Sequence, residues 1–367
     1  MDAEKDLPDV NEPEELYEHY RFTIDKGQSP LRIDKYLMNH IGQTSRNRIQ
    51  NACEAECILV NSKPVKSNYK VKPADDIQIV LPEPVREIEI IPQDIPLDIV
   101  FEDDDLIVVN KPAGMVVHPA YGNYKDTLVN ALTYHLNEKR ETEKRRNGDA
   151  EISAPIHPFS PSPIHSIHRP GLVHRIDKNT SGLLVVAKTE LAMTKLAKEF
   201  FDRTIDRHYL ALVWGNFKEE QGTVTGNVGR NLKDRKIMDV FPDGEHGKHA
   251  VTHYKVVENF GYVTLVQCKL ETGRTHQIRV HMKHIGHPIF NDAEYGGHRI
   301  LKGTTFTKYK QFVENCFDLM PRQALHAATI GFIHPRTKKK LFFESKLPAD
   351  FESVLEKWRA YSNQKMT

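Results

Sequence analysis

The sequence has few cysteines, no long apolar run and almost no net charge. Its four cysteines are spread over 367 residues, which is too few for the disulfide framework of a secreted domain. No window approaches the roughly 18 consecutive apolar residues of a membrane span, and the N-terminus is acidic where a signal peptide would be basic. The net charge of +1 excludes a uniformly basic coat. We therefore expect a cytoplasmic protein that does not associate with membranes.

Motifs for common cofactors are also missing. The chain has no glycine-rich loop of the kind that holds a nucleotide phosphate. Cys53 and Cys57 are four residues apart, but no second pair of cysteines or histidines follows at the spacing of a zinc site. We interpret them as two semi-buried thiols. The sequence assigns no residue to a metal and predicts no cofactor.

Charge is unevenly distributed along the chain. Residues 1–20 contain eight acidic side chains and one lysine, whereas residues 32–72 contain eight arginines or lysines and three acids. A cationic segment can bind a phosphate backbone whatever the total charge, because the counterions that it displaces are local. The charge pattern therefore permits RNA binding without demonstrating it.

Composition divides the chain into segments. The acidic residues 1–20 are typical of a flexible tail. Residues 22–82 combine short helical and strand patterns, which predicts a small α/β domain. A Pro- and Glu-rich linker at 83–96 leads to a larger domain at 97–350. Within it, the charged and then Pro/Ser/His-rich stretch 138–170 is predicted to be a disordered insertion.

Four cations of the small domain are predicted to share one face: Arg32, Lys35, Arg46 and Arg48. For any one of them, an ordinary solvated face is the simpler interpretation. Segments 32–37, 45–50 and 60–61 resemble the alpha-L RNA-binding module first named from ribosomal protein S4. Together with the local positive charge, this resemblance favours contact with RNA phosphates.

The larger domain is predicted to be α+β. Apolar strand patterns follow one another at 209–213, 251–257 and 262–270, and a turn at 259–261 joins the last two as a hairpin. A helical pattern at 191–201 stands apart from them. Strands in succession with helices set apart indicate a mixed, largely antiparallel sheet flanked by helices and loops.

The most informative segment is GLVHRIDKNTSG at 171–182, which precedes the apolar strand pattern 183–187. It places Asp177 between Arg175 and Lys178. Opposite charge nearby lowers the pKa of a carboxyl group, so we expect Asp177 to be ionised and to act as a nucleophile or an ion-pair partner. An isolated Asp before a strand is more often a turn cap or a surface ion pair, and the companion motifs favour the functional interpretation.

A second cluster, LETGRTHQIRVH at 270–281, predicts a strand end followed by a helix. Arg279 lies one turn into this helix, where a buried guanidinium could hold an Asp carboxylate through a bidentate pair. Arg274 and His276 are predicted to face RNA or the turn. Five cationic or amide side chains crowd the first two turns, which weakens the interpretation of an ordinary surface helix.

These clusters resemble the motifs of the RluA/RluD family of pseudouridine synthases over about residues 100–345. In that family the Asp of a His-Arg-Leu-Asp-x-x-Thr-Ser-Gly run is essential, and Asp177 matches it with Ile176 in place of Leu. The resemblance implies that Arg279 pairs with Asp177.

The resemblance also implies roles for residues around the target base. Tyr209 matches a strand tyrosine that stacks on the base, although Arg207 stands where many relatives have lysine. Arg175 would fill the space left by the flipped nucleotide or hold its phosphate. His174 joins the residues expected to bind RNA or substrate.

The reaction implied is the isomerisation of specific uridines to pseudouridine in RNA, with large-subunit ribosomal RNA as the expected substrate. It breaks the glycosidic bond, turns the uracil and rejoins it through carbon 5, with no redox step and no need for a cofactor. The base must leave its stack to reach Asp177. We expect the protein to act as a monomer.

Two other functions are open on the sequence. A non-catalytic RNA-binding or ribosome-assembly factor would use the basic module and an inactive catalytic fold. A glycosidase that releases the base would need a second carboxylate placed as acid or base, and the Asp177 motif offers none.

Overall fold

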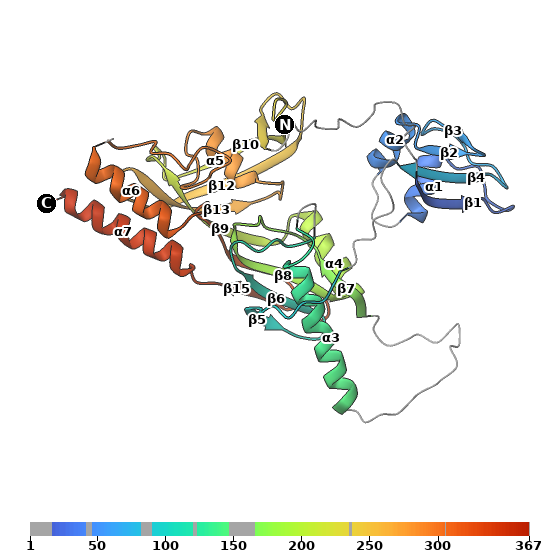
Figure 1. Cartoon of the computed structure of the whole chain (residues 1–367), viewed down its shortest axis with the longest axis horizontal. Helices are drawn as coiled ribbons and strands as arrows, with labels where there is room; N and C mark the ends of the chain where they lie inside the picture. Colours follow the sequence, from blue (N-terminus) through green and yellow to red (C-terminus); the bar gives the residue numbers. More distant parts are fainter. Residues whose placement is uncertain are drawn as a thin grey trace, which may run out of the picture. The chain divides into compact units, whose positions relative to one another are not determined.

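The computed structural model describes residues 17–41, 46–81, 90–119, 123–146, 166–234, 237–304 and 306–366. The chain forms two compact units, Met1–Glu89 and Ile90–Thr367 (Figure 1). None of the helices in the described ranges is long and apolar enough to cross a membrane.

The first unit is a four-stranded antiparallel sheet with two helices. Its elements are β1 (Tyr17–Thr23), α1 (Ile33–His40), α2 (Arg46–Glu54), β2 (Ile58–Val60), β3 (Lys63–Pro64) and β4 (Asp76–Leu81). The strand order is β1-β4-β2-β3. Ile33 and Leu37, one helical turn apart on α1, are completely buried and pack with Ile58 and Ile77 of the sheet. The predicted small α/β fold is confirmed.

The second unit is built on an 11-stranded sheet. Its strands are β5 (Ile99–Glu102), β6 (Leu106–Lys111), β7 (Ser166–Leu172), β8 (Ser181–Thr189), β9 (Asp206–Trp214), β10 (Gln221–Arg230), β11 (Met238–Phe241), β12 (Lys248–Asn259), β13 (Val263–Leu270), β14 (Leu325–Ile333) and β15 (Lys340–Glu344). The order is β11-β10-β12-β13-β9-β14-β8-β6-β5, with β15 beside β14 and β7 beside β8. The β14–β8 pair is parallel and the other pairs are antiparallel, as the predicted mixed sheet requires.

Helices cover this sheet: α3 (Leu128–Arg146), α4 (Glu190–Asp202), α5 (Gln277–His284), α6 (Thr307–Leu319) and α7 (Ala349–Met366). Residues 183–187 of β8 are all buried because the strand has helices on both faces. Leu183 and Val185 pack with Leu196 of α4, whereas Leu184 and Val186 belong to the cluster that contains Leu132 of α3. The continuous apolar run therefore reflects burial on two sides.

The larger unit extends beyond the predicted boundary at residue 350. Helix α7 lies beside α6 (Figure 1), and its Phe351, Leu355 and Trp358 are fully buried. The Trp358 ring lies 6.4 Å from the ring of Trp214 in β9. The predicted boundary is too early because the charged positions of α7 mask its buried stripe.

Three other predicted boundaries need correction. Tyr17–Tyr20, assigned to the tail, belong to β1, which pairs with β4. The stretch predicted to be a disordered insertion, 138–170, begins inside α3 and ends inside β7, so at most residues 147–165 remain for it, and these lie outside the described residues. Of the predicted linker, residues 90–96 contact the larger unit, where Asn130 donates to the Ile91 carbonyl at 2.8 Å. Residues 1–16 and 82–89 also lie outside the described ranges.

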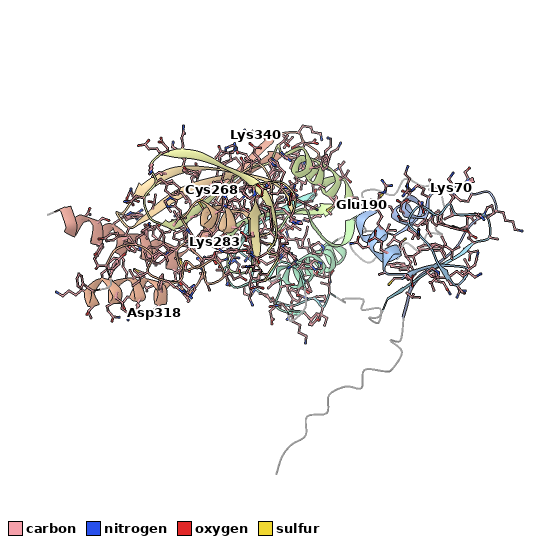
Figure 2. All side chains as sticks on the ribbon, turned by 90° about the horizontal axis from the view of Figure 1, so that it is seen from above. Lys70, Glu190, Cys268, Lys283, Asp318 and Lys340 are labelled. Carbon is pink, nitrogen blue, oxygen red and sulfur yellow. The ribbon has the colours of Figure 1, made fainter. Side chains whose placement is uncertain are left out.

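All four cysteines are free thiols. Cys53 is buried and Cys57 is half-buried, so the interpretation of two semi-buried thiols is confirmed. Cys268 lies in the interior of the larger unit, whereas Lys340 at the start of β15 is exposed (Figure 2).

Candidate active site

Asp177 lies in the loop between β7 and β8, and backbone contacts fix the shape of this loop. The Thr180 amide donates to the Asp177 carbonyl at 3.1 Å. Gly182 follows at the start of β8 with φ +116°, and a Cβ there would lie 2.2 Å from the Ala327 carbonyl oxygen of β14. Only glycine allows β8 and β14 to approach so closely, which explains the glycine that ends the motif.

Lys111 at the end of β6 also contacts this loop through hydrogen bonds to backbone carbonyls. Its side chain is 1% exposed, and its Nζ donates to the carbonyls of Pro112, Met115 and Lys178 at 2.7, 2.9 and 3.0 Å. Burial lowers the pKa of Lys111 to about 7, against the opposing effect of the Asp177 charge. Lys111 therefore joins the turn after β6 to the residue that follows Asp177.

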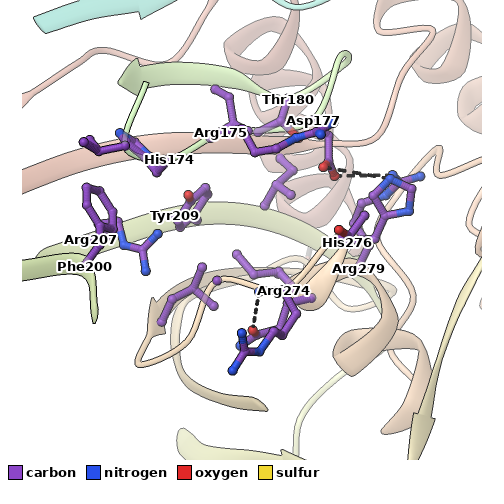
Figure 3. Close-up of a pocket in the computed structure, with 18 of the residues that line it drawn as sticks. His174, Arg175, Asp177, Thr180, Phe200, Arg207, Tyr209, Arg274, His276 and Arg279 are labelled. Atoms are coloured by element: carbon purple, nitrogen blue, oxygen red, sulfur yellow. Dashed lines mark hydrogen bonds and ion pairs between the residues drawn. The ribbon is translucent and has the colours of Figure 1, made fainter. Parts of the chain in front are cut away.

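A cavity of about 350 Å³ opens beside Asp177. It is lined by all seven site residues that the sequence proposes in the larger unit: His174, Arg175, Asp177, Tyr209, Arg274, His276 and Arg279 (Figure 3). They come from the β7–β8 loop, from β9 and from the start of α5, which are separated in sequence by up to about 100 residues. In the sheet, β9 lies between β13, which leads to α5, and β14, which pairs with β8, so folding brings these segments together.

Arg279 is almost completely buried, and three carboxylates surround it. Its Nε and Nη2 donate to the two oxygens of Asp292 at 2.7 and 2.8 Å, and Nη2 also contacts Glu294. Its Nη1 lies 3.4 Å from Oδ2 of Asp177 (Figure 3). Burial alone would lower the pKa of Arg279, but the hydrogen bonds and charges of these acids raise it above its usual value.

The expected bidentate pair of Arg279 thus forms with Asp292, and Asp177 receives one longer contact. The implied pair with Asp177 forms, but without bidentate geometry, because spacing within the motif at 270–281 carries no information about the position of Asp292. Asp292 is completely buried, and its Oδ1 also accepts from the amides of Glu294 and Tyr295. A signal was present, since two acids two residues apart follow the cation-rich helix.

His276 lies against Asp177 and does not face away from it. It begins α5 in the left-handed region, with φ 54°. Its Nδ1 hydrogen-bonds to the Tyr295 hydroxyl at 2.9 Å, and its Nε2 lies 3.9 Å from Oδ1 of Asp177. Burial lowers the pKa of His276, while the Asp177 charge opposes this effect. Arg274 is turned toward β12, where its Nε donates to the His249 carbonyl at 3.2 Å.

Tyr209 forms the middle of the cavity wall. It is 6% exposed, so its ring can offer one face to the cavity while the rest is packed. Burial raises the pKa of Tyr209, the charge of Arg207 opposes this rise, and the charge of Asp177 adds to it. A flat ring beside the Asp177 carboxylate is suited to stacking against a planar base.

His174 lines the same cavity but is also part of the packing. Its Nε2 accepts from the Val185 amide at 3.0 Å, and its ring stacks on Phe200 at 4.5 Å. Burial, together with the charge of Arg207, lowers the pKa of His174 to about 3. His174 is therefore a neutral ring at neutral pH, whereas Arg175 beside it is exposed.

Two other buried histidines predict acid sensitivity of the larger unit. Burial lowers the pKa of His281 and of His326 to about 4, from about 6.5 in an unfolded chain. Between about pH 6.5 and 5 the unfolded state binds more protons than the folded state. The free energy of unfolding should therefore decrease as the pH is lowered through this window, by up to about 1.4 kcal/mol per pH unit for each histidine. Urea unfolding at several pH values measures this slope.

The matching variant is His326→Gln. It should reduce the slope of the free energy of unfolding against pH by the contribution of one histidine. An equal free energy of unfolding at pH 6.5 and pH 5 would contradict the prediction. His326 is suited to the test because it lies outside the cavity, where it hydrogen-bonds to Ser181 and Ser345 at 2.9 and 2.8 Å.

In the smaller unit, one buried acid gathers two of the predicted RNA-binding cations. Asp34 is completely buried and accepts from Arg32 at 3.1 and 2.9 Å and from Arg46 at 3.0 Å. Burial on its own would raise the pKa of Asp34, but these hydrogen bonds and charges lower it. Lys35 is exposed, and the Arg48 side chain lies outside the described residues. Arg32 and Arg46 are therefore held together by Asp34, and the three side chains carry a net charge of about +1.

One group of side chains in the described ranges has the geometry of a metal site. Ligand atoms of Asp103, Asp105 and His334 lie within 4.8 Å of one another. These atoms already have partners, because His334 Nε2 bonds Asp103 at 2.7 Å and Arg336 bonds both oxygens of Asp105 at 2.7 and 2.6 Å. We interpret the group as an ion-pair cluster that joins the start of β6 to the turn after β14.

Comparison with known proteins gives matches to both units. A family model described as RNA pseudouridylate synthase matches residues 105–284, and one described as S4 domain matches residues 31–77. The chain is 46% identical over 337 residues to an uncharacterized RNA pseudouridine synthase of Chlorobaculum parvum, an alignment that covers 92% of this chain and 96% of that protein. It is 42% identical over 334 residues to ribosomal large subunit pseudouridine synthase D of Zymomonas mobilis, with 89% and 93% covered.

Proposed function

This chain belongs to the RNA pseudouridylate synthase family, and we propose that it converts specific uridines of large-subunit ribosomal RNA to pseudouridine. One observation carries the proposal: a single cavity contains the carboxylate of Asp177, the ring of Tyr209 and the buried guanidinium of Arg279. Relatives named for the large ribosomal subunit, with 42% and 38% identity, support this class of substrate.

The proposed reaction takes place on a nucleotide that has left its stack. Unstacking costs a few kcal/mol and is easiest in loops and bulges of RNA. Tyr209 then stacks on the uracil and holds it in the cavity. Asp177 acts on the sugar or the base, which requires an ionised oxygen in a fixed position. Arg279 places a positive charge beside this Asp177 oxygen and fixes the position of the oxygen, since Arg279 is itself held by Asp292.

Other cations extend the contact to the RNA backbone. Arg175 is exposed at the cavity and is placed to occupy the space of the flipped nucleotide or to bind its phosphate. His174, Arg274 and His276 complete the wall of the cavity. In the S4 domain, Arg32, Lys35, Arg46 and Arg48 would bind phosphates of a structured RNA.

The geometry favours neither alternative function. A glycosidase needs a second carboxylate that is free to act as acid or base near Asp177, but Asp292 and Glu294 both accept hydrogen bonds from Arg279. A non-catalytic assembly factor would not need the ionised, positioned Asp177. We propose that the chain acts as a monomer in the cytoplasm, where its proposed substrate, ribosomal RNA, would be found.

Mapping of pseudouridines in cells with and without the protein tests the proposal. We expect loss of one or a few sites in large-subunit ribosomal RNA, restored by the intact chain. Unchanged pseudouridine at every site would reject the function. Loss restricted to another RNA would keep the activity and reject the substrate class.

A further inference from the structure

Arg207 of β9 is a buried cation that lines the cavity and has no acidic partner. It is 8% exposed, and in the described part of the chain no carboxylate lies within 4 Å of its nitrogens. Its guanidinium carbon lies 5.0 Å from the centre of the Phe200 ring, and its Nε is buried without a hydrogen-bond partner. Phe200 and Tyr209, the side chains that it contacts, are uncharged. A buried charge is costly unless a partner compensates it, so a charge-compensating or acceptor group supplied by the ligand is expected here.

The position of Arg207 in the cavity is opposite that of Asp177. Figure 3 shows Arg207, His174 and Phe200 at one end, Asp177, His276 and Arg279 at the other, and Tyr209 between them. The electrostatics agree, because Tyr209 is affected by the charges of both Arg207 and Asp177, whereas His174 is affected by Arg207 and His276 by Asp177. A base stacked on Tyr209 would therefore span the distance between the two ends.

We propose that Arg207 donates a hydrogen bond to the carbonyl oxygen of the uracil ring that points away from the sugar. This inference rests on the proposed function, in which Asp177 acts where the base joins the sugar. The ring atom opposite N1 is C4, so the uridine presents its C4 oxygen to the far end of the cavity. The guanidinium is cationic and only donates hydrogen bonds, and it meets an acceptor there.

The same contact suits the product. Isomerisation exchanges N1 and C5 by a half-turn of the ring about the line through N3 and C6, and this turn also exchanges C2 and C4. The ring atom opposite the new bond at C5 is then C2, which also carries a carbonyl oxygen. Arg207 can therefore hold a carbonyl before and after the ring turns. Cytidine would present an amino donor to Arg207 instead, so the contact also selects uridine.

The test measures the activity of the full-length protein on two RNA fragments. Both carry the mapped site, one with uridine and one with 4-thiouridine, whose sulfur is a weaker acceptor. A lost hydrogen bond to a charged group corresponds to a factor of about 10 to 100, so Arg207→Gln should lower kcat/KM on uridine RNA by that factor. On 4-thiouridine RNA, the wild type and the variant should differ by less than about threefold, because the contact is already weakened.

Arg203→Gln is the matched control, because Arg203 is an exposed arginine at the end of α4. Its effect should be equal on the two RNAs. If Arg207→Gln also lost the same factor on both, the carbonyl contact would be refuted. A phosphate partner would in addition reduce the slope of log affinity against log salt by about 1. An inactive wild type on every RNA would instead reject the proposed function, so the two failures are distinguishable.

Discussion

An Asp177→Asn variant is expected to lose pseudouridine formation by about 10⁴-fold while it still folds and binds RNA. The factor is the upper end of what one positioned group contributes to catalysis. Asparagine keeps the shape of the side chain and can still accept the Arg279 Nη1 contact at 3.4 Å, but it removes the ionised oxygen. Single-turnover formation of pseudouridine in a ribosomal RNA fragment measures the loss.

The side chain of Asp177 is 20% exposed, and its contact with Arg279 is secondary to that of Asp292. We therefore expect the melting temperature and the RNA affinity of this variant to stay close to those of the wild type. Asp104→Asn, which changes an exposed acid at the turn before β6, should retain full activity. If Asp177→Asn retained even one tenth of the activity, Asp177 could not be the catalytic group.

An Asp292→Ala variant is expected to lose about 3–5 kcal/mol in its free energy of unfolding, because it leaves the buried Arg279 without its bidentate partner. The same change should lower kcat by about 10²-fold, since Arg279 would no longer be held where it meets Asp177. Denaturant unfolding measures the first effect and single-turnover kinetics the second.

Glu294→Gln is the comparison that separates burial from charge. Glu294 contacts the same guanidinium, but its side chain is 48% exposed, so its removal should cost no more than about 1 kcal/mol. Asp292→Asn should recover part of the activity, because the amide oxygen can still accept from Arg279 and from the Tyr295 amide. Equal destabilisation by Asp292→Ala and Glu294→Gln would contradict the assignment of Asp292 as the residue that holds Arg279.

Local motifs were sufficient to predict the elements that carry the site. The apolar run at 183–187 predicted β8, and the helical spacing of residues 191–201 predicted α4, because these patterns are read within one element. The family resemblance is confirmed for both the S4 and the catalytic domain. The end of the domain was missed, because the burial of Trp358 in α7 depends on contacts with residues more than 100 positions away.

The sequence by itself determined the chemistry that this protein carries: an acid between cations at 177, a tyrosine at 209 and an arginine at 279. Each lies in a short motif whose residue types are fixed in the chain. The tertiary structure alone decided which partners these groups have. Arg279 donates two hydrogen bonds to Asp292 and one longer one to Asp177. Arg207 lines the cavity, and in the described part of the chain no acidic side chain pairs with it. Partners across a sheet depend on strand order and packing, which are set by long-range burial and not by local spacing.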